Sequence, residues 1–345
     1  MAAPLEQLSL TDNDSDYLWY TTRIDSGDVE TLLRSSDPGG AAPSVTLHLK
    51  NGGVGYVYID GVLLGGTLAS SSAVYAARPA RRAGGRDAQR SGASAGATAA
   101  QAHRVSLSRA ALRKVVSAYS RAGGAAASSA QTSTLQILSV AMGLANGGDE
   151  PASGKGLVDV TLNGKSLANT STWSHSYMLR GAVDARAPLA PPTVAWTPVA
   201  ALKPSEAKAT ASWFKTVMDA PPLPQRTASV RAKAATEPFP QLAYALDLSS
   251  MNKGVAYING FHLGRYWLIT GQGEGCAPPH HGSLCYMHFR HSGEPTQSLY
   301  HIPTSLLKPT GNELFLFEET AAVDSTQPLR DLSKVRIVAL TEHPL

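Results

Sequence analysis

The residues best suited to chemistry lie in two short stretches of the second half of the chain. In the first, GVAYINGFHLGRYW at 254–267, an Asn-Gly pair is followed by His262, Arg265, Tyr266 and Trp267. Aromatic rings pack against the apolar face of a pyranose, and arginine donates hydrogen bonds to hydroxyl groups. These four residues are therefore candidates for carbohydrate binding. The alternative, which is favoured because aromatic side chains dominate cores and interfaces, is that they fill a core or dock against another domain.

The second stretch, CAPPHHGSLCYMHFRH at 276–291, combines thiols and imidazoles, the ligands that zinc prefers. A metal set would be drawn from Cys276, His280, Cys285 and His288, but their spacing fits none of the usual zinc motifs. A disulfide between Cys276 and Cys285 in an oxidising compartment, or two reduced thiols in the cytosol, is the preferred interpretation. We therefore expect no metal and no other cofactor.

Paired carboxylates are the requirement for glycoside hydrolysis, with about 5–5.5 Å between them in a retaining enzyme. Glu318 and Glu319 are adjacent at the end of an expected strand, so their side chains should point to opposite faces. Asp16 and Asp247 lie next to expected strands but have no partner that the sequence reveals. No Gly-rich phosphate loop and no local Ser-His-Asp pattern is present. These patterns argue against catalysis by this chain.

An arginine-rich, low-complexity stretch runs from about 77 to 102 and has almost nothing to bury. Its arginines could bind RNA phosphates or an acidic protein surface, but no aromatic residues are interleaved for base stacking. A solvated loop is favoured over a nucleic-acid contact. The candidate basic contacts are Arg78, Arg81, Arg82, Arg86 and Arg90.

Composition and length fit a globular protein with two domains. The 345 residues contain 43% hydrophobic and 16% charged residues, with a net charge of +4. That charge is too small to identify a nucleic-acid binder. No apolar run approaches the ~18 residues of a membrane span, and the N-terminus resembles neither a signal nor a transit peptide. We expect an intracellular protein if Met1 is the true start.

Most of the chain shows the pattern of an all-β protein, with short alternating runs punctuated by Gly, Asn and Asp. Asp60-Gly61 and Asn259-Gly260 each close an expected two-residue hairpin, and each is followed by a second glycine at the same spacing. We interpret these two hairpins as equivalent positions of two related domains. Helical spacing is clear in one segment alone, at about 109–121.

The boundary between the domains is expected near three prolines, Pro188, Pro191 and Pro192, because prolines disfavour helices and central strands. We predict a first β-sandwich at 1–187, interrupted by an insertion at about 77–130 that is partly disordered or helical. The second β-sandwich is predicted at 188–345.

Several blocks together resemble plant-type β-galactosidases of glycoside hydrolase family 35. They are LEQLSLTDNDSDYLWYTTRI, LQILSVAMGLANGG, VDVTLNGKSL, ASWFKTVMDAP, YALDLSSMNKGVAYINGFHLGRYW and SLYHIPTSLLKPTGNELFLFEE, in that order. The resemblance implies two galactose-binding-like jelly rolls. In that family a separate (β/α)₈ barrel precedes them and carries both catalytic glutamates, and no segment here could replace it. The loop at 276–285 resembles a loop of that family in which several cysteines pair as disulfides. The resemblance therefore implies a disulfide between Cys276 and Cys285 in an oxidising compartment.

Taken together, these patterns predict a non-catalytic scaffold or binding subunit, derived from the accessory domains of a β-galactosidase and part of a larger assembly of protein subunits. One alternative is a galactoside-binding module. Another is a barrel-less fragment, or one chain of a split β-galactosidase.

Overall fold

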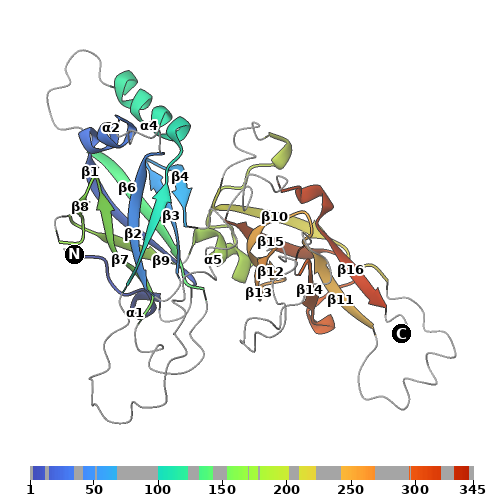
Figure 1. The fold of residues 1–345 in the computed structure, drawn as a ribbon. Helices are drawn as coiled ribbons and strands as arrows, with labels where there is room; N and C mark the ends of the chain where they lie inside the picture. The colour runs from blue at the N-terminus through green and yellow to red at the C-terminus, as the bar shows by residue number, and fades with distance from the viewer. Residues whose placement is uncertain are drawn as a thin grey trace, which may run out of the picture. The chain divides into compact units, whose positions relative to one another are not determined.

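The computed structural model describes residues 3–11, 15–34, 42–50, 53–67, 100–122, 132–142, 154–169, 171–177, 179–201, 210–222, 242–268, 295, 297–319 and 330–341. The chain divides into two compact units, Met1–Leu179 and Arg180–Leu345. Antiparallel sheets dominate both units (Figure 1), and the expected all-β sandwich class is confirmed. No helix of the described residues is long and apolar enough to cross a membrane.

Unit 1 is a sandwich of a five-stranded sheet, ordered β4-β3-β6-β1-β9, and a four-stranded sheet, ordered β5-β2-β7-β8. Leu18, Ile137, Leu47 and Val160 are buried in the core that the two sheets enclose. Its elements are α1 (Gln7–Thr11), β1 (Tyr17–Asp25), α2 (Ser26–Arg34), β2 (Ser44–Lys50), β3 (Val54–Ile59), β4 (Val62–Gly66), β5 (Gln101–Ser106), α4 (Arg109–Ala122), β6 (Thr132–Val140), β7 (Gly156–Leu162), β8 (Lys165–Ser166) and β9 (Ser174–Tyr177).

The helix expected at 109–121 is confirmed as α4, which lies beside α2 at one end of the unit (Figure 1). Leu112 and Val115 of α4 are buried against the sandwich core. The structure also places β5 within the range expected to be an insertion, where it pairs with β2. Burial alternates along β5, but two of its three inward positions, Gln101 and His103, are polar, so hydrophobic alternation did not reveal this strand.

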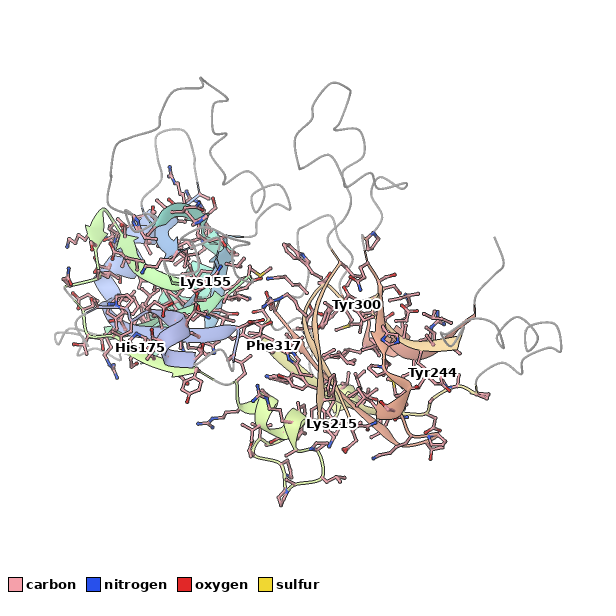
Figure 2. The ribbon with its side chains drawn as sticks, turned by 90° about the horizontal axis from the view of Figure 1, so that it is seen from below. Lys155, His175, Lys215, Tyr244, Tyr300 and Phe317 are labelled. Atoms are coloured by element: carbon pink, nitrogen blue, oxygen red, sulfur yellow. The ribbon has the colours of Figure 1, made fainter. Side chains whose placement is uncertain are left out.

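Unit 2 packs a four-stranded sheet, ordered β10-β15-β12-β13, against a three-stranded sheet, ordered β14-β11-β16. Side chains fill the space between the sheets (Figure 2), and Leu246, Ile258, Leu316 and Ile337 form part of this core. Its elements are α5 (Arg180–Arg186), the 3-10 turns Val199–Ala201, Thr304–Leu306 and Leu332–Lys334, and the strands β10 (Ser212–Met218), β11 (Leu242–Asp247), β12 (Lys253–Ile258), β13 (Phe261–Trp267), β14 (Leu299–Ile302), β15 (Asn312–Glu318) and β16 (Arg336–Thr341).

The two expected hairpins have the same geometry. Asp60 and Asn259 both have φ of 49°, and each is followed by a glycine with positive φ. Each side chain accepts a hydrogen bond from the neighbouring strand, from the Thr134 N–H at 2.8 Å in unit 1 and from the Glu313 N–H at 3.0 Å in unit 2. A β-bulge follows at the same place in both hairpins. The hairpin turn is therefore fixed both by its backbone and by one side-chain bond.

Candidate functional site

Hairpin β12–β13 places three of the four predicted sugar-binding residues on one face of the sheet. His262 lies opposite Tyr257, Arg265 opposite Val255 and Trp267 opposite Lys253. Tyr257, Val255 and Lys253 alternate along β12 and share a face, so the three candidates share that face as well. We call it the outer face, since the other face of this sheet packs on the three-stranded sheet.

Tyr266 lies on the opposite, inner face and is fully buried in the core of unit 2. Its hydroxyl donates towards the Phe317 carbonyl at 3.0 Å and the Glu318 carboxylate at 3.1 Å. A ring that is 0% exposed offers no face to a sugar. For Tyr266 the geometry is that of the alternative interpretation, an aromatic residue that fills the core.

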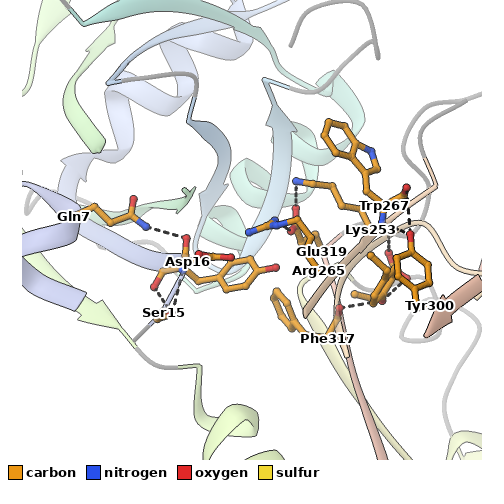
Figure 3. A network of polar contacts seen from close by, with 12 residues as sticks. Gln7, Ser15, Asp16, Lys253, Arg265, Trp267, Tyr300, Phe317 and Glu319 are labelled. Atoms are coloured by element: carbon orange, nitrogen blue, oxygen red, sulfur yellow. Dashed lines mark hydrogen bonds and ion pairs between the residues drawn. The ribbon is translucent and has the colours of Figure 1, made fainter. Parts of the chain in front are cut away.

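Three charged side chains, Lys253, Arg265 and Glu319, contact one another on the outer face. The Glu319 carboxylate accepts a hydrogen bond from Arg265 Nη1 at 3.0 Å and pairs with Lys253 Nζ at 2.5 Å (Figure 3). Lys253 Nζ also lies 5.2 Å from the centre of the Trp267 ring. Lys253 and Glu319 are almost completely buried, whereas the Arg265 side chain is 18% exposed. We call Lys253, Arg265, Trp267 and Glu319 the outer-face cluster.

Burial lowers the pKa of Lys253, because an ammonium group loses its hydration, while the Glu319 carboxylate acts in the opposite direction. The carboxylate also fixes the orientation of Arg265. The indole Nε1 of Trp267 is buried and has no hydrogen-bond partner among the residues that the structure describes. The outer-face cluster therefore combines an oriented guanidinium group with an aromatic ring.

His262 completes the row along β13. It is exposed, and its ring stacks on Tyr257 with ring centres 4.5 Å apart and an interplanar angle of 22°. Residues of one face along a strand are spaced by about 7 Å, so three of them span roughly 14 Å. His262, Arg265 and Trp267 thus form a row of suitable length for a short saccharide.

Glu318 and Glu319, the adjacent carboxylates, engage different partners, as expected from their alternation along the strand. Glu318 accepts hydrogen bonds from the Lys253 and Asn252 N–H groups at 2.9 and 3.2 Å on the inner side. Both glutamates are 0% exposed. Asp247, another carboxylate considered for chemistry, pairs with Arg336 at 3.1 Å. Their contacts are those of structural carboxylates.

Burial raises the pKa of Glu318 to about 7, although two backbone N–H groups, Arg330 and the Tyr266 hydroxyl all favour its ionised form. A raised carboxyl pKa means that the folded state binds a proton more tightly than the unfolded state. The stability from this group is complete below pH ~4.5 and is lost as the pH rises through 7. By linkage the loss is about 3 kcal/mol.

Glu318→Gln should remove this pH dependence, because an amide has no proton to lose. We expect unit 2 of the wild type to open more readily at pH 8 than at pH 5, and the variant to narrow that difference. Hydrogen exchange of the β12 and β15 peptides, read by mass spectrometry and corrected for the intrinsic rate, measures this. An unchanged pH dependence in the variant would exclude Glu318 as its source.

Register comparison shows that the charged groups occur in unit 2 alone. Pairing of β3 with β6 and of β12 with β15 makes Val54, Ser139 and Val140 the equivalents of Lys253, Glu318 and Glu319. The hairpin pairings make Leu63, Gly66 and Thr67 the equivalents of His262, Arg265 and Tyr266. The same fold therefore forms without these charges.

Other equivalent positions are conserved in type between the units. Trp19 and Trp213 occupy matching positions on β1 and β10. Each packs against a tyrosine at a matching position, with 5.2 Å between the ring centres of Trp19 and Tyr58 and 6.0 Å between those of Trp213 and Tyr257. This aromatic pair belongs to the shared framework, whereas the outer-face cluster is a specialisation of unit 2.

Sequence reasoning missed Lys253 and treated Glu319 only as a possible catalytic acid. The available signal was a lysine and a glutamate within otherwise apolar strands. Among the described residues, no group of three or more His, Cys, Asp and Glu side chains could hold a metal ion. The predicted Cys276, His280, Cys285 and His288 set and the arginines at 78–90 lie outside the described residues.

Comparison with known proteins agrees with the resemblance. Residues 211–312 match the family described as beta-galactosidase, galactose-binding domain. The chain is 31% identical over 339 residues to Beta-galactosidase 8 of Arabidopsis thaliana, covering 94% of the chain and 30% of that protein. It is 27% identical over 331 residues to Beta-galactosidase 10 of the same plant, covering 91% and 35%. The chain spans about a third of the length of these curated relatives, and its resemblance to the galactose-binding-like domains of plant β-galactosidases is confirmed.

Proposed function

We propose that the chain is a non-catalytic accessory module, and that unit 2 binds galactose-containing saccharides on the outer face of β13. The observation that carries this proposal is the difference between the units. Unit 1 forms the same sheet with Val54, Val140 and Gly66 where unit 2 has Lys253, Glu319 and Arg265. Buried ion pairs contribute little net stability compared with apolar residues, so a role beyond folding explains them best.

The chemistry of the row suits a sugar. Arg265 supplies several N–H donors in a fixed plane, and Glu319 orients that plane. Trp267, which is half-buried, supplies a ring for the apolar face of a pyranose. His262 adds an exposed polar ring at the other end. The match of residues 211–312 to a galactose-binding domain supports galactosides as the class of ligand.

A hydrolytic role receives no support from the two adjacent glutamates. Glu319 is engaged by Lys253 and Arg265, and Glu318 is buried on the other side of the strand. Retaining hydrolysis needs two carboxyl groups about 5–5.5 Å apart on either side of a bound sugar. The purified chain should therefore leave a chromogenic β-galactoside intact, and normal turnover would contradict the non-catalytic part of the proposal.

Arg265→Ala tests the binding part. We expect the affinity for β-galactosides, measured by isothermal titration calorimetry, to fall at least tenfold, because a charged hydrogen bond contributes about 1.5–3 kcal/mol. Trp267→Phe, which keeps an aromatic ring but makes it smaller, should weaken binding less. Lys215→Ala on β10, a strand at the other edge of the sheet, is the matched control and should bind as the wild type does.

Absence of any signal for the wild type in calorimetry and on a galactoside array would overturn the binding proposal. It would favour the second candidate, a scaffold that docks on protein subunits. Phe261 at the hairpin tip is 49% exposed, and Leu189 is 89% exposed in the segment next to it, where Gly260 approaches Pro188. A contiguous exposed apolar patch is typical of docking surfaces, and these two side chains are the candidates for one.

A further inference from the structure

Shortly after β8 the sequence reads Asn169-Thr170-Ser171. An asparagine followed by any residue except proline, and then by serine or threonine, is the acceptor motif of N-glycosylation. We propose that Asn169 is a glycan attachment site of unit 1 in a chain that enters the secretory pathway. This inference is independent of the proposed function, because it concerns the other unit.

Accessibility is the first structural requirement, and Asn169 satisfies it. The residue is exposed on a surface turn, and no hydrogen bond or ion pair engages its side chain within the part of the chain that the structure describes. Ser171, which supplies the hydroxyl group of the motif, is half-buried. The amide can therefore be reached by an enzyme without unfolding a strand.

Anchors on both sides hold this turn to the sandwich. Before it, the N–H groups of Leu167 and Ala168 donate to the Asp159 carboxylate at 3.1 and 2.9 Å. After it, Trp173 is buried, and its indole N–H donates to the Leu167 carbonyl at 3.1 Å. A bulky substituent on the exposed Asn169 side chain would leave these contacts in place.

The location also gives the glycan a physical effect. β8 is the edge strand of its four-stranded sheet, and both of its residues are exposed. An edge strand presents unpaired backbone groups on which another chain can add a strand. A glycan three residues beyond β8 would shield this edge from such pairing.

The reaction needs a lipid-linked oligosaccharide diphosphate as the sugar donor. The Asn169 amide nitrogen attacks C1 of the first sugar, and the bond from C1 to the diphosphate oxygen breaks. The nitrogen loses one proton to a base of the transferase, and the lipid diphosphate leaves with the bonding electrons. No oxidation or reduction takes place, and the amide retains one N–H.

Secretion of the full chain from a eukaryotic host behind a foreign signal peptide tests the site. A second motif, Asn13-Asp14-Ser15, is removed by Asn13→Gln in every chain that is secreted for the test. Release of glycans by peptide-N-glycosidase in heavy-oxygen water should then convert residue 169 to labelled aspartate, which peptide mass spectrometry detects. Asn169→Gln and Ser171→Ala should each abolish the label and leave the circular dichroism spectrum unchanged.

A secreted chain with the wild-type spectrum and an unmodified Asn169 peptide would overturn the proposal. Label that persists in Ser171→Ala would overturn it as well, because the motif would then not be the determinant. Neither result would affect galactoside binding by unit 2, so the two proposals can fail separately.

Discussion

Gly254→Ala should prevent unit 2 from folding. A Cβ atom at residue 254 would lie 1.7 Å from the Phe317 carbonyl oxygen and 2.9 Å from the Tyr266 hydroxyl. The first obstacle is backbone of the central strand β15, which cannot move without breaking its pairing with β12. We expect the free energy of unfolding of unit 2 to fall by more than about 4 kcal/mol, which is at the upper end of the range for single substitutions. Protection of β12 and β15 amides from hydrogen exchange should disappear.

Gly55→Ala is the matched control, because Gly55 occupies the equivalent position of unit 1. Its added Cβ would meet Leu47 Cδ1 at 2.6 Å, which is the far end of a flexible side chain. Overpacking of this kind costs about 1–3 kcal/mol, so unit 1 should remain folded. Equal losses in the two variants would contradict the role assigned to the β15 backbone.

Lys253→Val should destabilise unit 2 by about 3–5 kcal/mol, because it removes a partner of a carboxylate that is fully buried. The double variant Lys253→Val, Glu319→Val installs the residues that unit 1 has at these positions, Val54 and Val140. We expect it to recover to within about 1 kcal/mol of the wild type, since apolar replacements of buried ion pairs are often neutral or stabilising. Arg265, which is partly exposed, can then be hydrated.

Galactoside titration of the double variant separates stability from function. If the charges serve binding, the variant should be as stable as the wild type and bind at least tenfold more weakly, because Arg265 has lost the carboxylate that orients it. A double variant as unstable as Lys253→Val would show that unit 2 needs the ion pair to fold. Wild-type affinity in a stable double variant would contradict the role of the outer-face cluster in binding.

Local sequence signals predicted the framework well. Asp60-Gly61 and Asn259-Gly260 identified both hairpins because the positive φ of such pairs is a property of the residues themselves. The helix expected at 109–121 was found as α4, since its apolar spacing spans several turns. The nine-residue α2 was missed, because a short helix offers too few positions for its period to be recognised.

Composition of the candidate site could not be predicted in the same way. Lys253 and Glu319 are far apart in sequence, and only the register of β12 on β15 brings them together. Strict alternation along β13 would have placed His262 on the same face as Tyr266. The β-bulge beside Tyr257 reverses that relation, so His262 shares its face with Arg265 and Trp267. A bulge of this kind leaves little trace in hydrophobic alternation.

Equivalent registers in the two units create a hazard during folding, when strands of one unit can be exchanged for those of the other. If β12 paired with β6 in place of β3, the Lys253 ammonium would lie beside Val140 without a carboxylate. An uncompensated buried charge costs several kcal/mol, which penalises this exchange. The ion pair that distinguishes the units therefore also disfavours this exchange, whether or not it is needed for the stability of unit 2.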